Sequence, residues 1–153
     1  MNKFYIILAI SIVMTNYNFS QEKKQIQKSD LEWKNDLDNL SYQVLRKSYT
    51  ERPFTGEYNL HFENGIYKCK GCNQILFSSV NKYESNCGWP SFDKAIPSSI
   101  VYIEDLSHNM KRIEIKCSKC DGHLGHVFND GPKETTGKRY CINSAALSFN
   151  KKQ

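Results

Sequence analysis

Two Cys-x-x-Cys sequences constrain the fold of this chain more than any other feature. Cys69-Lys70-Gly71-Cys72 and Cys117-Ser118-Lys119-Cys120 lie far apart in the sequence. The spacing lets both thiolates of a pair face one ion while backbone amides of the turn hydrogen-bond to the sulfurs. Four thiolates leave no open coordination position, so the pattern predicts one structural Zn²⁺ per chain that ties two distant hairpins together. The expected ligands are Cys69, Cys72, Cys117 and Cys120.

The chain has six cysteines, and their number leaves other uses open. Six cysteines in an exported domain could form three disulfides. One Cys-x-x-Cys pair could instead be a redox dithiol, or the cysteines could hold an iron–sulfur cluster. The paired spacing favours zinc, because cysteines separated by two residues rarely bond each other except at redox sites.

The N-terminus predicts export. Met1–Lys3 is short and basic, Phe4–Met14 is apolar, and a polar stretch follows. This apolar run is too short to span a bilayer comfortably, but it suits a signal peptide. We therefore expect a signal peptide at 1–20, a charged linker at 21–28 and one domain at 29–150, in a periplasmic or secreted protein. A buried first helix and an uncleaved membrane anchor are the alternatives.

Composition predicts an ordinary globular domain. Of the 153 residues, 39% are hydrophobic and 24% are charged, with a net charge of +5. The positive charges are scattered along the chain, which indicates solvated surface and disfavours a nucleic-acid partner. We expect a monomer.

The domain is predicted to begin with helical structure. Ser29 and Glu32 have the spacing of a capping box, which marks a helix N-terminus. Apolar residues then recur on one helical face, and we expect the helix to break near Ser41 into two pieces. The residues of this face are Trp33, Leu37, Leu40 and Val44.

From residue 49 onward the apolar period becomes that of strands. Residues 58–62 alternate up to Asn64-Gly65, a two-residue hairpin signal, and a return strand would run into Cys69. Further strands are expected at 100–103, at 113–117 and, as a hairpin or bent strand, at 140–149. The predicted class is a mainly β (α+β) domain with short N-terminal helices.

Cys141 is the first candidate for chemistry, because it has no neighbouring cysteine and follows a cation and an aromatic. In a strand, Arg139, Cys141 and Asn143 share one face. A cation within a few Å favours the thiolate, which is the nucleophilic form. The alternative is an inert cysteine in the core.

Two further segments could complete a reactive pocket. His123 and His126 are flanked by glycines and could bind a metal or transfer protons, since imidazole titrates near neutral pH. Cys87 precedes Gly88-Trp89-Pro90, where a tryptophan between glycine and proline could line a pocket. A second thiol on such a loop could resolve a sulfenic acid. Otherwise Cys87 is inert and the histidines are structural.

Taken together, these motifs resemble the methionine-R-sulfoxide reductases of the B type, the SelR family. The similarity runs from about Leu40 to Phe149, nearly the whole expected domain. Its specificity comes from three motifs in this order: Cys87–Phe92, His123–Phe128 and Arg139–Ser144. Tyr42–Arg46, Thr50–Gly56 and Gly65–Cys69 also match.

The resemblance implies a SelR-like fold of two antiparallel sheets, with the four-cysteine zinc site on the side away from the pocket. It places Cys141 at the position of the family's nucleophile and Cys87 at that of the resolving cysteine. His123 and His126 match the pocket histidines, and Asn143 matches a polar positioning residue.

The same resemblance assigns the substrate contacts. Trp89 matches the aromatic residue that holds the S-methyl group of the substrate, and Phe128 is placed with it among the substrate-binding residues. Arg139 lies within the nucleophile motif, and its charge suggests an electrostatic role.

The expected reaction is the reduction of methionine-R-sulfoxide in proteins and peptides. Cys141 would become a sulfenic acid, Cys87 would form a disulfide with it, and thioredoxin or a thioredoxin-like dithiol would reduce that disulfide. Two rivals remain: a zinc-binding interaction module without catalysis, and a general thiol–disulfide oxidoreductase.

Overall fold

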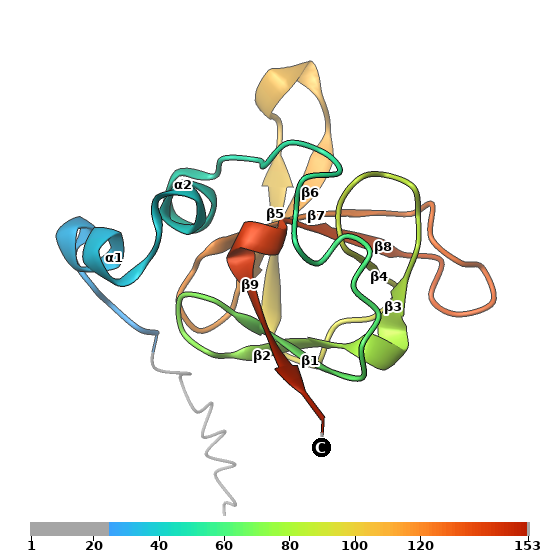
Figure 1. Ribbon diagram of the computed structural model, residues 1–153. Helices are drawn as coiled ribbons and strands as arrows, with labels where there is room; N and C mark the ends of the chain where they lie inside the picture. The colour runs from blue at the N-terminus through green and yellow to red at the C-terminus, as the bar shows by residue number, and fades with distance from the viewer. Residues whose placement is uncertain (1–24, 153) are drawn as a thin grey trace, which may run out of the picture.

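Two antiparallel sheets form the body of the chain, whose computed structural model describes residues 25–152 (Figure 1). The strands are β1 (Gly65–Cys69), β2 (Ile75–Ser78), β3 (Lys82–Tyr83), β4 (Ser91–Phe92), β5 (Ile100–Asp105), β6 (Arg112–Cys117), β7 (His123–Phe128), β8 (Arg139–Ile142) and β9 (Leu147–Lys151). The smaller sheet has the order β2-β1-β9 and the larger one β3-β4-β8-β7-β6-β5. With two short helices beside them, the sheets confirm the predicted fold class.

The expected signal peptide at 1–20 and most of the linker lie outside the described residues. Between residues 25 and 152, no helix is both long and apolar enough to cross a bilayer.

The core lies between the two sheets and is largely aromatic. Phe77 of β2 stacks on Phe92 of β4, with 4.4 Å between the ring centroids. Tyr67 of β1 meets Phe92 edge-on at 5.1 Å, and Tyr140 of β8 lies 5.9 Å from Phe77. Each fully buried aromatic contributes about 1.5–3 kcal/mol by leaving water. Because these rings come from both sheets, burying them fixes how the sheets stack.

The helices α1 (Asp30–Asp36) and α2 (Asn39–Lys47) lie beside the sheets, and α2 packs against β7 and a 3₁₀ turn, η3 (Ser144–Ala146). Trp33, Leu37 and Val44 of the predicted apolar face are buried. Leu40 is 45% exposed, so the prediction is wrong for that residue.

Two caps set the helix boundaries. The capping box is confirmed, since Glu32 N donates to Ser29 Oγ at 3.3 Å and Ser29 N donates to Glu32 Oε2 at 2.7 Å. Helix α2 starts after Asp38, whose carboxylate accepts from Ser41 N at 2.9 Å. The break between the two helices is therefore at Leu37 and Asp38 and not near Ser41, because aspartate is among the residues most favoured at a helix N-cap.

The expected strand at 58–62 is wrong. These residues form turns and irregular backbone, and Gly65 already belongs to β1. Tyr58 N donates to Ser144 Oγ at 3.1 Å, so this part of the backbone bonds to a side chain and not to a neighbouring strand. Leu60 and Phe62 are exposed, so their alternation with Tyr58 does not mark a buried face.

The segment 140–149 runs from one sheet to the other. It leaves the larger sheet at the end of β8, turns through η3, and enters the smaller sheet as β9. It is therefore not a hairpin. Figure 1 shows the 48–60 segment, in teal to green, crossing the larger sheet near this turn.

Candidate active site and metal centre

Cys141 lies in the middle of the larger sheet. In register it faces Ser91 of β4 on one side and His126 of β7 on the other. Cys87 lies in the loop before β4, and its Sγ is 3.5 Å from Cys141 Sγ. The structure thus brings together two cysteines that are 54 positions apart in the chain.

The two sulfurs lie within hydrogen-bonding distance of each other. Cys87 Sγ is hydrogen-bonded by Cys141 and also accepts from Ser85 Oγ at 3.0 Å. These bonds lower the pKa of Cys87 to about 4, with the bond from Cys141 as the largest cause. The same contact, together with burial, raises the pKa of Cys141 far above its ordinary value. In the resting pair Cys87 carries the negative charge and Cys141 keeps the proton.

Arg139 acts on Cys141 in the predicted direction, but it is not the largest influence on this thiol. Arg139 does lower the pKa of Cys141, but Cys87 and burial outweigh it. Its guanidinium is already bound by Asp130 through Nε and Nη2, at 2.9 and 2.8 Å, and lies 4.5 Å from the ring centre of Phe128. The carboxylate of Asp130 therefore offsets much of the electrostatic effect of Arg139 on the Cys141 sulfur.

A cavity of about 180 Å³ opens over Cys141. It collects most of the predicted site residues, together with three that the sequence analysis did not identify. Its lining is Thr50, Trp89, Arg112, Gly125, His126, Phe128, Cys141 and Asn143. Cys87, His123 and Arg139 do not line it.

Glu51 fixes the positions of two cavity residues, a role that the sequence analysis did not predict. Its backbone oxygen accepts from Trp89 Nε1 at 3.1 Å, and its backbone N donates to Asn143 Oδ1 at 3.0 Å. Its buried carboxylate accepts from the amides of Ser144 and Ala145 at 2.6 and 2.9 Å. Burial raises the pKa of Glu51 while these bonds oppose the rise. A solvated surface glutamate and a buried one look alike in a sequence, so only the fold could reveal it.

A β-bulge puts both histidines on one face of β7. Residues three apart on a regular strand point to opposite faces. Here the register slips, so that Ile115 of β6 pairs with Gly125 and the next residue pairs with His123. The rings of His123 and His126 are consequently only 5.6 Å apart. A Cβ on Gly125 would collide with the carbonyl oxygen of Cys141, so glycine lets the bulged strand approach β8.

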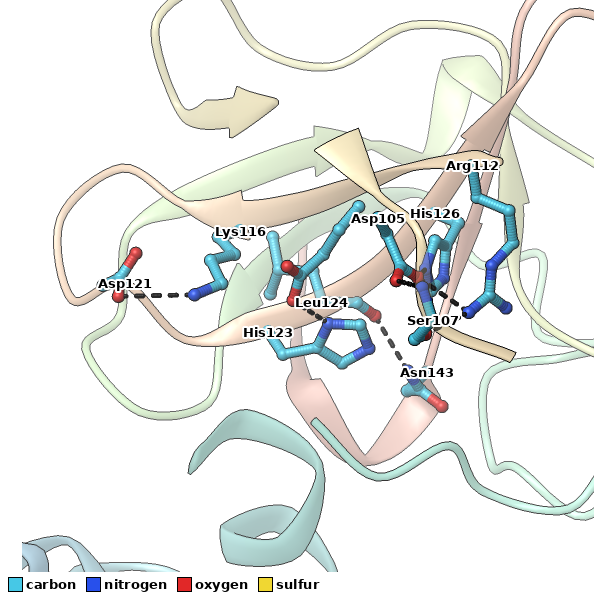
Figure 2. Close-up of polar contacts among 10 residues, drawn as sticks. Asp105, Ser107, Arg112, Lys116, Asp121, His123, Leu124, His126 and Asn143 are labelled. Atoms are coloured by element: carbon cyan, nitrogen blue, oxygen red, sulfur yellow. Dashed lines mark hydrogen bonds and ion pairs between the residues drawn. The ribbon is translucent and has the colours of Figure 1, made fainter. Parts of the chain in front are cut away.

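Each histidine is bound by a different carboxylate (Figure 2). His126 Nε2 contacts Asp105 Oδ2 at 2.7 Å, and His123 Nδ1 contacts Glu114 Oε1 at 2.6 Å. Burial lowers the pKa of His126, and Asp105 only partly offsets this. At neutral pH the His126 ring is therefore mostly neutral.

The four remaining cysteines form a separate buried cluster. Their Sγ atoms all lie within 4.8 Å of one another, with 3.6 Å between Cys69 and Cys120 and 3.5 Å between Cys72 and Cys117. Sulfurs placed tetrahedrally at about 2.3 Å from Zn²⁺ are about 3.8 Å apart, so these residues could hold such an ion. Neither Cys87 nor Cys141 belongs to the cluster.

The cluster is remote from the cavity. Arg112 begins β6 and Cys117 ends it, and at about 3.3 Å per residue the strand separates them by roughly 17 Å. Arg46 of α2 donates to the backbone oxygen of Cys120 at 2.8 Å, which fastens the helices to the cluster. An ion there would join the β1–β2 and β6–β7 turns without touching the cavity.

These features define a class of small β protein with a cysteine at the floor of a cavity and a separate cluster of four cysteines that could hold a metal ion. The chain belongs to the SelR domain family, whose profile matches residues 37–151. It is 52% identical to the "probable methionine-R-sulfoxide reductase B" of Caenorhabditis elegans, over 86% of this chain and 88% of that protein.

Bacterial and archaeal relatives are equally similar. The "peptide methionine sulfoxide reductase MsrB" of Hahella chejuensis is 54% identical over 82% of this chain and 91% of its own length. That of Methanosarcina mazei is 53% identical, with 86% and 94% covered. Among solved structures, the Mis18 "Yippee-like" domain is 19% identical and gives a TM-score of 0.48 over 60% of this chain and 99% of that domain, which is too low to establish a shared fold.

Proposed function

We propose that this chain reduces methionine-R-sulfoxide in proteins and peptides to methionine. Its family membership and relatives of about half-identical sequence support the assignment to oxidoreductases that act on sulfur groups. The observation that carries the mechanism is the 3.5 Å between Cys141 Sγ and Cys87 Sγ beneath a cavity walled by Trp89 and Phe128. The aromatic rings would hold the S-methyl end of the side chain, and the sulfoxide would lie over Cys141.

In the first step Cys141 takes the sulfoxide oxygen. The sulfur of Cys141 loses its proton and attacks the sulfoxide, the S–O bond of the substrate breaks as an S–O bond forms on Cys141, and the transferred oxygen is protonated. Overall, a thiol and a sulfoxide become a sulfenic acid and a thioether, so Cys141 is oxidised by two electrons and the substrate is reduced by two. His126 lines the cavity beside Cys141, which supports a role for it in relaying the proton. His123 is buried behind it.

In the second step Cys87 resolves the sulfenic acid. Its sulfur displaces the hydroxyl group from Cys141, which leaves as water, and a disulfide forms. A bonded pair of sulfurs is about 2.0 Å apart, so the 85–90 loop needs to move by only about 1.5 Å. An external dithiol of the thioredoxin type then exchanges with the disulfide and restores both thiols.

Zn²⁺ held by Cys69, Cys72, Cys117 and Cys120 would be structural. Four thiolates leave it no position for a substrate, so it would supply stability and no chemistry. If residues 1–20 act as a signal peptide, the enzyme works outside the cytosol, and its dithiol donor must be exported as well.

The experiment is a single-turnover assay with a peptide that contains both epimers of methionine sulfoxide. Loss of the R epimer alone supports the proposal, whereas no loss with a dithiol present rejects it in favour of a non-catalytic metal-binding module. Cys141→Ser should abolish the reaction. Cys87→Ser should convert one equivalent of substrate and then stop with a sulfenic acid on Cys141, detectable by mass as one added oxygen. A Cys87→Ser protein that cycles with thioredoxin at the normal rate would refute the resolving role.

A further inference from the structure

The hairpin formed by β5 and β6 reaches the cavity through two residues that the proposed reaction leaves unexplained. Asp105 ends β5 and Arg112 begins β6, opposite each other in register. Figure 2 shows both side chains converging on His126. Asp105 Oδ2 contacts Arg112 Nη2 and His126 Nε2, each at 2.7 Å, and Asp105 Oδ1 accepts from Ser107 N at 2.9 Å. Arg112 also lines the cavity.

The ionised carboxylate of Asp105 determines which nitrogen of His126 carries the hydrogen. Bonds from Ser107 and His126 hold the pKa of the Asp105 carboxyl well below its ordinary value, so it is ionised at any working pH. An ionised carboxylate only accepts hydrogen bonds. At 2.7 Å, His126 Nε2 must therefore carry the hydrogen. In the neutral ring this leaves Nδ1 as the unprotonated nitrogen.

Nδ1 of His126 is also the nitrogen that is free to act. No described residue hydrogen-bonds to it, and the ring lines the cavity in register with Cys141. His123 has the opposite arrangement, because Glu114 occupies its Nδ1. Its Nε2 is buried without a partner among residues 25–152, in a side chain that is only 3% exposed. Of the two histidines, only His126 lines the cavity.

We propose that Asp105, held in place by Arg112, is a positioning residue that locks His126 in the Nε2–H tautomer and so makes Nδ1 the proton-transfer atom. This inference rests on the proposed reductase function and specifies which atom serves it. Nδ1 takes the proton from the Cys141 thiol as sulfur attacks, and returns it to the oxygen that Cys141 receives. The thiol and the sulfoxide then give a sulfenic acid and a thioether, with no proton lost to solvent.

The salt bridge to Arg112 keeps the carboxylate in this role. Arg112 Nη2 also donates to Ser107 Oγ at 3.2 Å. Arg112 and Ser107, which both bond to the Asp105 carboxylate, are therefore also bonded to each other and hold it in one orientation. A carboxylate that holds a catalytic imidazole sets both its tautomer and its orientation, and in the serine proteases the matching Asp→Asn change costs about 10⁴ in kcat. General acid–base transfer by one residue contributes about 10²–10⁴-fold.

The test uses the full metal-loaded chain in a Cys87→Ser background, which isolates the first step. Asp105→Asn preserves shape but can donate to Nε2, so the hydrogen is expected to move to Nδ1. The single-turnover rate should fall at least about tenfold. The matched control is Glu104→Gln on the same hairpin, because within residues 25–152 Glu104 pairs only with Lys111, at the surface. It should leave rate and tautomer unchanged.

Two readouts separate positioning from simple loss of structure. Long-range ¹H–¹⁵N spectra report the His126 tautomer, which should be Nε2–H in the unsubstituted chain and altered by Asp105→Asn. The acid limb of the single-turnover rate should also move to lower pH, because the pKa of His126 falls further once Asp105 no longer raises it. The other titratable or charged groups around the ring are Arg112, Glu114, His123 and Cys141, and the substitution leaves them in place.

The tautomer of His126 in the unsubstituted chain tests the proposal even if Asp105→Asn does not fold. A neutral His126 that carries its hydrogen on Nδ1 would overturn the proposal. So would a folded Asp105→Asn protein with an unchanged rate, tautomer or acid limb. Arg112→Lys keeps a cation beside Asp105 and should retain the tautomer. If the unsubstituted chain reduces no sulfoxide, the proposed function fails instead, while the spectra still report on the tautomer.

Discussion

Replacing Cys87 should change the acidity of Cys141, and the size of the effect follows from their separation. Two unit charges 3.5 Å apart repel by about 5 kcal/mol at an effective dielectric constant of about 20, equivalent to about 3.5 units in a pKa. In the native pair this repulsion falls on Cys141, because Cys87 ionises first. Cys87→Ser removes the charge, so the pKa of Cys141 should fall by about that amount.

The assay is the rate of iodoacetamide alkylation against pH, with the modified residue identified by mass. In the unsubstituted chain, Cys87 should be alkylated first, already at about pH 5, because its pKa is about 4. In Cys87→Ser, alkylation at Cys141 should begin at lower pH than in the native pair. Cys87→Ala serves as the control, since it removes the charge without adding a hydroxyl donor. If the pH midpoint of Cys141 alkylation is unchanged or higher in both variants, the conclusion that Cys87 raises the pKa of Cys141 is refuted.

Three further predictions concern stability and substrate binding. Gly125→Ala should destabilise the fold by about 3 kcal/mol in urea, because its Cβ meets the backbone of Cys141, which cannot move aside as a flexible side chain would. If the four cysteines hold Zn²⁺ as proposed, removing it with a strong chelator should unfold the chain, since a four-thiolate site contributes on the order of 10 kcal/mol, as much as the whole net stability of a domain. Circular dichroism measures the loss of β structure, and retained β structure would contradict this. Trp89→Phe keeps an apolar wall but loses the hydrogen bond to the Glu51 oxygen. It should raise KM about fivefold, from a loss of about 1 kcal/mol, with kcat nearly unchanged.

Local signals in the sequence predicted the parts of the fold that depend on neighbouring residues. The capping box at Ser29 and Glu32 needs only one helical turn, and it is present. The strand at 100–103 was expected from a run of β-branched residues and the strand at 113–117 from alternating isoleucines, and they form β5 and β6. The four-cysteine cluster was also predictable, because Cys-x-x-Cys spacing fixes the geometry of each half. In all three cases the chemistry that decides the outcome lies within a few residues.

The failures involve partners that are distant in sequence. Residues 58–62 alternate like a strand, but their backbone meets Ser144 and not another strand. The two histidines share a face only because β7 bulges against β6, and no local pattern marks a bulge of this kind. Asp105 and Arg112 were not identified either, since a charged residue at each end of a hairpin usually means solvent-exposed surface.

The ionisation of the cysteine pair shows most clearly why sequence proximity misleads about chemistry. Arg139 lies two residues before Cys141 and on the same face of β8, so an argument from the strand alone assigns the thiolate to Cys141. In the folded chain, Asp130 has already bound that guanidinium in two places, whereas Cys87 approaches Cys141 to 3.5 Å. Coulomb interactions weaken with distance and with compensating charge, so the nearer, uncompensated group prevails. A nucleophile that keeps its proton at rest needs a base beside it, and this need gives a neutral His126 a function that an already ionised Cys141 would not require.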